Sequence, residues 1–290
     1  MKYKKLAKHI PALTMLTVFI LLSCESSKKT EVADSTKEEA TKREFGVQVY
    51  SVRDSLEGDF AGSMKKIADM GYSYIEAYDL QLDGTIFNMT AAEYRKTVED
   101  LGMSIVSSHA TYFTPDEADP VIKAAQDLGL KYVMIPWINE DLRKDYMAVA
   151  SNLNELGKKF KGSGVKIGYH NHDFEFELTE NEQVPLELMI QNTDPELVTF
   201  QLDLYWVVKA GFDPMELIKK YPGRFSSFHV KDANDSLEQT TVGTGIIDFK
   251  TILAAQETSS HTHYFVEDER EENPFENIQA DFDYVDQLEF

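Results

Sequence analysis

Histidine and carboxylate side chains recur at positions in this sequence that directly follow short apolar runs. These positions are Glu76, His109, His170-Asn171-His172-Asp173, Asp203, His229-Val230-Lys231-Asp232 and Glu267-Asp268. Imidazole and carboxylate groups together are typical ligands of a divalent metal ion. If the apolar runs are parallel strands, these groups all lie at the carboxyl ends of the strands, so we expect them to form one polar site.

The chemistry that such a site supports is removal of a proton next to a carbonyl group. A metal ion that binds a hydroxyl and the neighbouring carbonyl polarises the carbonyl and stabilises the enediolate that forms. A carboxylate or imidazole nearby serves as the base. Return of the proton gives isomerisation or epimerisation, whereas loss of a neighbouring group gives elimination.

Eight short apolar runs alternate with helical segments along the chain, which predicts a parallel sheet. The predicted strands span residues 45–49, 74–78, 104–108, 132–136, 165–169, 198–202, 225–230 and 263–266. Helix signals lie between them: residues 90–93 form a capping-box pattern, Asp213-Pro214 begins another helix, and helices are expected over 59–70, 120–128, 141–161 and 247–256. Residues 271–290 are expected to form the last helix.

Eight strand-helix repeats predict an α/β protein with a single (β/α)8 barrel, the TIM barrel, over residues 45–290. An open doubly wound sheet is the structural alternative. It normally has a glycine-rich phosphate turn after its first strand, and residues 49–54 do not form one.

The first 44 residues differ in composition from the rest of the chain. Residues 1–23 combine four lysines with an apolar run shorter than a membrane span, and end in a Leu-Leu-Ser sequence before Cys24, the only cysteine. This ending resembles a bacterial lipobox and predicts a lipoprotein signal peptide over 1–23, with a lipid on Cys24. An ordinary signal peptide is the alternative. Residues 25–44 are polar and lack aromatic residues, which predicts a flexible linker.

These features predict an exported, periplasmic domain that is held at a bacterial membrane only through the lipid on Cys24. The chain has 29 basic and 50 acidic residues, and removal of the signal peptide leaves a formal charge near −25. A polyanion is repelled by such a surface, so nucleic acid is not an expected partner.

Five segments of the chain resemble strands of the xylose isomerase-like TIM-barrel family. They are residues 45–53 (FGVQVYSVR), 169–176 (YHNHDFEF), 201–206 (QLDLYW), 228–232 (FHVKD) and 265–267 (FVE), within a match over residues 45–270. The family includes sugar phosphate isomerases and epimerases, inosose dehydratases and, more distantly, an apurinic endonuclease branch. The resemblance implies a TIM barrel that acts on a sugar.

The resemblance also implies a metal site. In the family, a Glu, an Asp, a His and a Glu from strands five to eight bind one Mn, Co or Mg ion, and the matching residues here are His170, Asp203, His229 and Glu267. His170 departs from this pattern, which shifts the expected ion from Mg toward Mn, Co, Zn or Fe. His172 or Glu175 as the fourth ligand, or a missing ligand, are the alternatives.

Five residues are the candidates for catalysis. Glu267 and Glu175 are the candidate acid and base, Lys231 the group that stabilises developing oxyanion charge, and His109 and His172 the groups that orient substrate hydroxyls. The alternatives without a catalytic role are a salt bridge from Lys231 to Asp232 or Glu267, and a solvated loop carboxylate for Glu175. Candidate aromatic residues for contact with a sugar ring are Tyr50, Tyr78, Tyr112, Trp137, Tyr205 and Trp206.

We therefore expect a metal-dependent sugar isomerase or epimerase. A non-phosphorylated carbohydrate is the expected substrate, because sugar phosphates are scarce outside the cytoplasm and residues 242–245 offer the only candidate phosphate turn. A lyase or dehydratase that acts on 3-keto-glycosides or inososes is the first alternative. A non-catalytic carbohydrate-binding lipoprotein is the alternative from another class, and the nuclease branch is disfavoured by the charge.

Overall fold

The computed structural model describes residues 44–255 and 262–290. The predicted signal peptide, Cys24 and residues 25–43 of the predicted linker lie outside the described residues. Among the helices that are described, none has the length and apolar composition that crossing a membrane requires.

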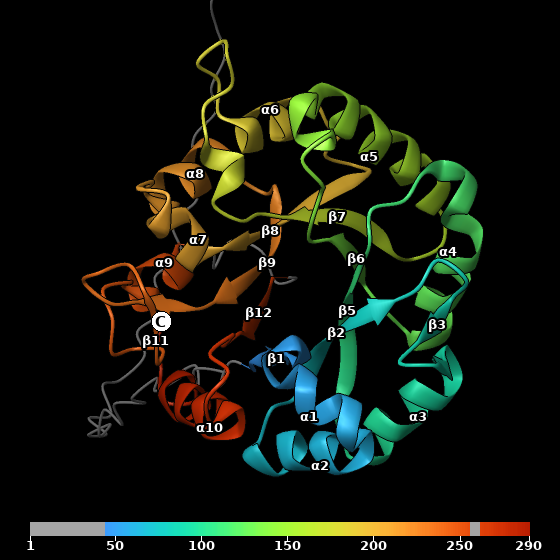
Figure 1. The fold of residues 1–290 in the computed structure, drawn as a ribbon, viewed down its shortest axis with the longest axis vertical. Helices are drawn as coiled ribbons and strands as arrows, with labels where there is room; N and C mark the ends of the chain where they lie inside the picture. The colour runs from blue at the N-terminus through green and yellow to red at the C-terminus, as the bar shows by residue number, and fades with distance from the viewer. Residues whose placement is uncertain (1–43, 256–261) are drawn as a thin grey trace, which may run out of the picture. The chain divides into compact units, whose positions relative to one another are not determined.

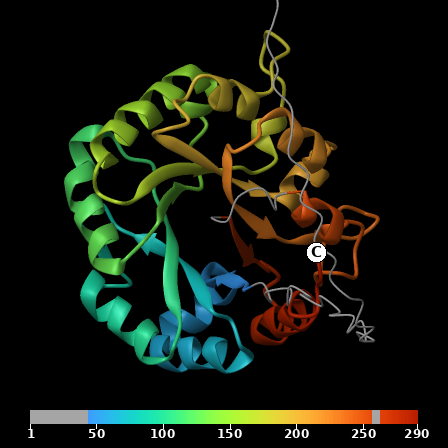
Figure 2. The same ribbon diagram turned by 180° about the vertical axis from the view of Figure 1, so that it is seen from behind.

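Parallel strands close into a barrel at the centre of the domain, and helices surround it (Figures 1 and 2). The ring is closed because β1 pairs with two neighbours, with Gly46 opposite Tyr74 on one side and Phe265 on the other. In order around the barrel, the strands are β1 (Gly46–Gln48), β12 (His263–Val266), β9 (Phe225–Val230), β8 (Val198–Asp203), β7 (Lys166–His170), β6 (Tyr132–Ile135), β5 (Ser104–Ala110) and β2 (Tyr74–Leu80). The predicted (β/α)8 barrel is confirmed, and the open sheet is excluded.

Two short hairpins extend the barrel at the carboxyl ends of its strands. Strands β3 (Thr85–Ile86) and β4 (Met89–Thr90) continue from β2, and β10 (Asp232–Ala233) pairs with β11 (Gln239–Thr240) after β9.

The helices largely follow the predicted signals. They are α1 (Arg53–Gly58), α2 (Phe60–Met70), α3 (Ala91–Asp100), α4 (Ala118–Leu128), α5 (Tyr146–Phe160), α6 (Pro185–Gln191), α7 (Leu204–Lys209), α8 (Pro214–Lys220), α9 (Phe249–Ala254) and α10 (Pro274–Val285). The capping box before α3 is present, since Thr90 Oγ1 accepts a hydrogen bond from the Glu93 amide and the Glu93 carboxylate accepts one from the Thr90 amide.

One predicted helix was too long, and three helices were not predicted. The expected helix over 141–161 is divided, because Asp145 caps the start of α5 and separates it from a 3₁₀ turn at Leu142–Lys144. Helices α1, α6 and α7 have six, seven and six residues, too few to show a helical period in the sequence.

The inward-facing side chains of the barrel change from apolar to polar toward the carboxyl ends of the strands. Side chains two residues apart on a strand face the same side, so Tyr74 precedes Glu76 and Phe265 precedes Glu267 in the interior. Five buried apolar residues pack together as a floor, namely Tyr74, Val106, Tyr132, Met134 and Phe265. Gly46 leaves room for this layer, since a Cβ there would lie 2.3 Å from the Tyr74 ring. The polar groups above are thus supported by a closed apolar layer.

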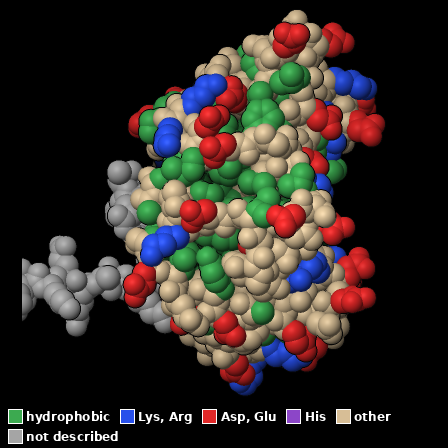
Figure 3. All heavy atoms as spheres, turned by 90° about the vertical axis from the view of Figure 1, so that its left-hand side faces the viewer, with side chains coloured by type: hydrophobic (Ala, Val, Ile, Leu, Met, Phe, Trp, Pro, Cys, Tyr) green, Lys and Arg blue, Asp and Glu red, His purple; other side chains and the backbone are tan. Residues whose placement is uncertain are grey.

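The outer surface carries both signs of charge. On the side shown in Figure 3, Lys and Arg side chains lie separately among Asp and Glu side chains, and hydrophobic side chains gather near the middle. This face has no concentrated basic patch of the kind that binds nucleic acid.

The unfolding free energy should depend on pH through Asp281, a fully buried residue on α10. Its Oδ1 accepts a hydrogen bond of 2.7 Å from the Val242 amide, and Oδ2 accepts none from the described residues. Burial raises the pKa of Asp281 to about 8, from 3.8 as the ordinary value. A pKa raised by folding gives stability that is full below pH 3.8 and is lost as the pH rises through 8. In wild type, the unfolding free energy should therefore fall by an amount on the order of a few kcal/mol between pH 5 and pH 9, and Asp281→Asn should abolish this fall.

Urea denaturation of both proteins at these two pH values tests the prediction. Asp283→Asn, an exposed substitution on the same helix, is the control and should keep the wild-type pH dependence. Equal pH dependence in wild type and Asp281→Asn would contradict it.

Candidate metal centre and substrate cavity

A cavity of about 550 Å³ opens at the carboxyl ends of the barrel strands. Its lining includes the ionisable residues Asp79, His109, His170, His172, Asp173, Glu267 and Glu269, and the aromatic residues Tyr50, Tyr78, Trp137 and Trp206. Two aromatic candidates, Tyr112 and Tyr205, are not part of this lining. Three of the six strand ends that the sequence singles out, those with His109, His170 and Glu267, therefore line one cavity.

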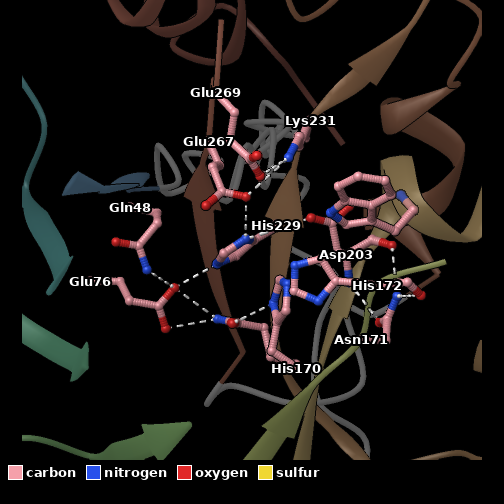
Figure 4. A network of polar contacts seen from close by, with 12 residues as sticks. Gln48, Glu76, His170, Asn171, His172, Asp203, His229, Lys231, Glu267 and Glu269 are labelled. Carbon is pink, nitrogen blue, oxygen red and sulfur yellow. Dashed lines mark hydrogen bonds and ion pairs between the residues drawn. The ribbon is translucent and has the colours of Figure 1, made fainter. Parts of the chain in front are cut away.

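Asp203, His229 and Glu267 form a buried cluster (Figure 4), and Glu267 also lines the cavity. One ligand atom from each lies within 4.8 Å of the other two. His229 Nδ1 is 3.0 Å from Glu267 Oε2 and 3.7 Å from Asp203 Oδ2. The cluster offers one nitrogen and two carboxylate donors, which suits a borderline divalent ion such as Mn, Co, Zn or Fe.

The Asp203 carboxylate supplies an independent reason to place a cation here. Its Oδ1 caps α7 by accepting a hydrogen bond of 3.0 Å from the Trp206 amide. Its Oδ2 is buried and accepts no hydrogen bond from any residue in 44–255 or 262–290. A buried carboxylate oxygen without a partner is unfavourable. A divalent cation bound between Asp203, His229 and Glu267 would satisfy it, so these residues fit a metal ion.

His170 belongs to a second cluster rather than to this one. Its partners there are His109 and His229, again with ligand atoms within 4.8 Å of one another. Of the four residues predicted to bind one ion, three therefore form the first cluster and His170 lies in the second. His229 belongs to both clusters.

Glu76, which the sequence showed only as a residue near a strand end, holds the other side of His229. Its Oε2 is 2.5 Å from His229 Nε2, and it also accepts a hydrogen bond of 2.9 Å from Gln48 Nε2. A carboxylate on the second nitrogen of a ligating histidine fixes the orientation of the ring. Burial alone would raise the pKa of Glu76, but the imidazoles of His109 and His229 outweigh it and hold the pKa well below the ordinary value.

In the sequence, the only indication of a role for Glu76 was that a charged residue occupies an inward position of an apolar strand. A buried charge must be paired, but the partner, His229, lies 153 residues away in the chain. Burial lowers the pKa of His229, and the carboxylates of Glu267 and Glu76 outweigh burial, so this pKa lies well above the ordinary value.

Lys231 is buried beside the first cluster. Its Nζ lies 3.4 Å from Glu267 Oε2 and also donates a hydrogen bond to Glu269, a residue that the sequence analysis missed. Asp232, one of its two predicted salt-bridge partners, instead binds backbone amides. Burial lowers the pKa of Lys231, but Glu267, Asp203 and Glu269 outweigh burial and raise it, so the ammonium group remains charged.

Glu175 lies away from the cavity and is not among its lining residues. Its side chain is fully buried, which excludes a solvated loop carboxylate. One oxygen accepts a hydrogen bond of 2.5 Å from the Tyr169 hydroxyl, and the other accepts one of 2.7 Å from the His172 amide. Burial raises the pKa of Glu175 to about 8. In this position Glu175 holds the segment that carries His172.

His172 lines the cavity and is packed among aromatic rings. Its ring stacks on Phe174 and contacts Trp137 and Trp206. Burial, and next the charge of Lys231, lower the pKa of His172 to about 3, which keeps the imidazole neutral. Its Nδ1 is buried and forms no hydrogen bond with the described residues.

The candidate phosphate turn at residues 242–245 is already filled by a side chain of the protein. The amides of Gly243 and Gly245 each donate a hydrogen bond of 2.9 Å to Asp232 Oδ2. The amides of Ala233 and Ile247 donate to Asp232 Oδ1 at 2.8 and 3.2 Å. Because these amides bind an internal carboxylate, they do not form a phosphate site.

Comparisons with known proteins agree with this architecture. The family model described as xylose isomerase-like TIM barrel matches residues 64–288. An inosose dehydratase of Bacillus cereus (strain AH820) is 27% identical over 155 residues, 46% of this chain and 51% of the relative. The chain thus matches about half the length of this curated relative.

Two solved structures from Parabacteroides distasonis, both described as sugar phosphate isomerase/epimerase, align over most of the chain. One is 25% identical with a TM-score of 0.75, over 88% of this chain and 97% of the other. The second is 28% identical with a TM-score of 0.71, over 83% and 97% of the two chains.

Proposed function

Since this chain belongs to the xylose isomerase-like TIM barrel family, we propose that it is a metal-dependent sugar-modifying enzyme that removes a proton next to a carbonyl group. The observation that carries the proposal is the convergence of Asp203, His229 and Glu267, of which Glu267 lines the cavity. Oδ2 of Asp203, which accepts no hydrogen bond from the described residues, supports a cation at that point.

The residues around the cluster divide the chemistry between them. A bound divalent ion would act as a Lewis acid that polarises the substrate carbonyl. Glu267, an ionised carboxylate that lines the cavity, takes the proton from the carbon next to that carbonyl. Lys231, which lies next to Glu267 and outside the cavity lining, supplies positive charge close to the substrate oxygen on which negative charge develops. His109 and His172 orient substrate hydroxyls from the cavity wall.

The fate of the proton determines the reaction class. Its return to carbon gives an isomer or epimer, the reaction that we propose first, with support from the names of the two Parabacteroides distasonis structures. In the alternative, a C–O bond on the next carbon breaks, a C=C bond forms, and the leaving group departs as water or an alcohol after taking up a proton. The inosose dehydratase relative supports this lyase reaction, on an inosose or a 3-keto-glycoside.

A non-phosphorylated sugar is the substrate class that we propose. Four carboxylates line the cavity, namely Asp79, Asp173, Glu267 and Glu269, and its described lining contains no Lys or Arg. A phosphate dianion would be repelled there. Tyr50, Tyr78, Trp137 and Trp206 offer apolar faces for a sugar ring. An exported domain, anchored by a lipid on Cys24, is part of the same proposal and rests on the composition of residues 1–44.

The metal content of the purified protein tests this function. Wild type, reconstituted with Mn, Co, Zn or Fe, should hold roughly one equivalent. Asp203→Ala should lose it, because the variant lacks one of the three clustered donors, whereas the exposed Asp283→Ala should keep it. Elemental mass spectrometry gives the stoichiometry, and exchange of the substrate α-proton in D₂O, followed by NMR on keto-sugars, shows whether the loaded protein is an enzyme.

Wild type without metal after reconstitution would contradict the proposal. Saturable sugar binding without turnover, unaffected by chelators, would instead support a carbohydrate-binding lipoprotein.

A further inference from the structure

Gln201 on β8 is a buried amide that lies between Glu76 and two imidazoles of the second cluster. Its Oε1 lies 3.0 Å from His109 Nε2 and 3.0 Å from His170 Nδ1. Its Nε2 lies 2.9 and 3.1 Å from the two oxygens of Glu76, and 3.2 Å from Ser227 Oγ.

The orientation of this amide follows from Glu76. A carboxylate only accepts hydrogen bonds, so the group that faces both Glu76 oxygens must be the NH₂ group of Gln201. The reverse orientation would place the amide oxygen against two carboxylate oxygens in the buried interior. Glu76 is itself held as a carboxylate by the ring of His229.

The orientation of the Gln201 amide determines which nitrogens of His109 and His170 carry a proton. The carbonyl oxygen of Gln201 also only accepts hydrogen bonds, so His109 Nε2 and His170 Nδ1 must each carry a proton. In a neutral imidazole the other nitrogen then bears the lone pair. For His109 this is Nδ1 and for His170 it is Nε2, and both rings line the cavity.

We propose that Gln201, oriented by Glu76, is a positioning residue that sets the tautomers of His109 and His170. With these tautomers, Nε2 of His170 can bind a cation, and Nδ1 of His109 can accept a hydrogen bond from a substrate hydroxyl. The opposite tautomers would present N–H groups, and a proton on Nε2 of His170 would prevent that nitrogen from binding a cation. Glu76 orients the ring of His229, since it binds Nε2 and Nδ1 then faces Glu267 and Asp203. The roles of the two nitrogens in binding a cation and a substrate rest on the proposed function. The tautomers themselves follow from the hydrogen bonds alone.

Long-range ¹H–¹⁵N NMR of the metal-free, ¹⁵N-histidine-labelled protein measures the tautomers directly. Spectra of His109→Asn and His170→Asn assign the two rings among the seven histidines. We expect a protonated Nδ1 in His170, which is the less common tautomer of free histidine, and a protonated Nε2 in His109. A protonated Nε2 and bare Nδ1 in His170 of wild type would overturn the proposal without any variant.

Gln201→Met removes both the acceptor and the donor while keeping a similar side-chain volume. In this variant we expect His170 to shift toward the Nε2-protonated tautomer, and the affinity for Zn²⁺ or Mn²⁺ to fall by about 10- to 100-fold. Ser227→Ala is the matched control. It removes the contact between Gln201 and the Ser227 hydroxyl, and it leaves the contacts of Gln201 with Glu76 and the two imidazoles in place. The control should keep the wild-type tautomers and metal affinity.

Unchanged tautomers and metal affinity in Gln201→Met would overturn the positioning role. If instead wild type binds no metal but its tautomers shift in Gln201→Met, the metal-dependent function fails while the effect of Gln201 on the two imidazoles is supported.

Discussion

Glu267→Gln is expected to lower kcat by about 10²- to 10⁴-fold, the usual contribution of a general base. Glutamine keeps the size of the side chain and an oxygen that can face the ion, but it cannot take a proton. Glu267 is suited to the role because it lines the cavity. Burial alone would raise its pKa, but Lys231 and His229 outweigh burial and hold the pKa well below the ordinary value, so the base is ionised at neutral pH.

Two measurements separate loss of the base from loss of the ion. Turnover at saturating metal reports kcat, and α-proton exchange in D₂O reports the proton-transfer step alone. Both should fall together in Glu267→Gln even when elemental analysis shows that the metal is bound. Glu271→Gln is the control, since the Glu271 side chain is 83% exposed and its ion pair with Arg53 is long, at 3.9 Å. A kcat of Glu267→Gln close to that of wild type would assign the base to another residue.

Lys231→Met is expected to lower the unfolding free energy of the metal-free protein by about 3–5 kcal/mol, the usual effect of removing one partner from a buried ion pair. Lys231 is 1% exposed and contacts two carboxylates, Glu267 and Glu269. Without its ammonium group these carboxylates remain buried with less positive charge nearby. Added metal should reduce the loss, because a bound cation restores positive charge next to Glu267.

Denaturant unfolding with and without the metal measures both effects. Lys220→Met is the matched control, since its ion pair with Glu187 lies at the surface at 2.7 Å and should contribute less than about 1 kcal/mol. A loss in metal-free Lys231→Met no larger than that of the control would show that the carboxylates are neutralised by other means.

The fold was largely predictable because each strand is a short apolar run, and every run except the one at 165–169 is followed by a helix signal. The closing contacts of Gly46 with Tyr74 and Phe265 are the consequence of that repeated unit. The helices α1, α6 and α7 were missed because they are too short to show a helical period of their own. The capping box at Thr90 was predictable because it depends on residues three apart.

The site was predictable at the level of strand ends but not at the level of partners. Asp203, His229 and Glu267 follow apolar runs and were identified in that way. The roles of Glu76 and Gln201 depend on contacts across the barrel, and Gln201 lies inside a strand where an amide gives no pattern in the sequence. The same limit applies to Glu175, whose local sequence alternates as an exposed strand would, although its carboxylate is buried against Tyr169 and His172.

The filled turn around Asp232 has a further consequence for how this barrel distinguishes ligands. Four amides there bind one carboxylate of the same chain. The Asp232 carboxylate is part of the chain, so its effective concentration at these amides is high. A free phosphate would have to displace this carboxylate in order to bind. Discrimination against anionic ligands at this turn is then intramolecular competition, and the conformation of the turn does not depend on the supply of any metabolite.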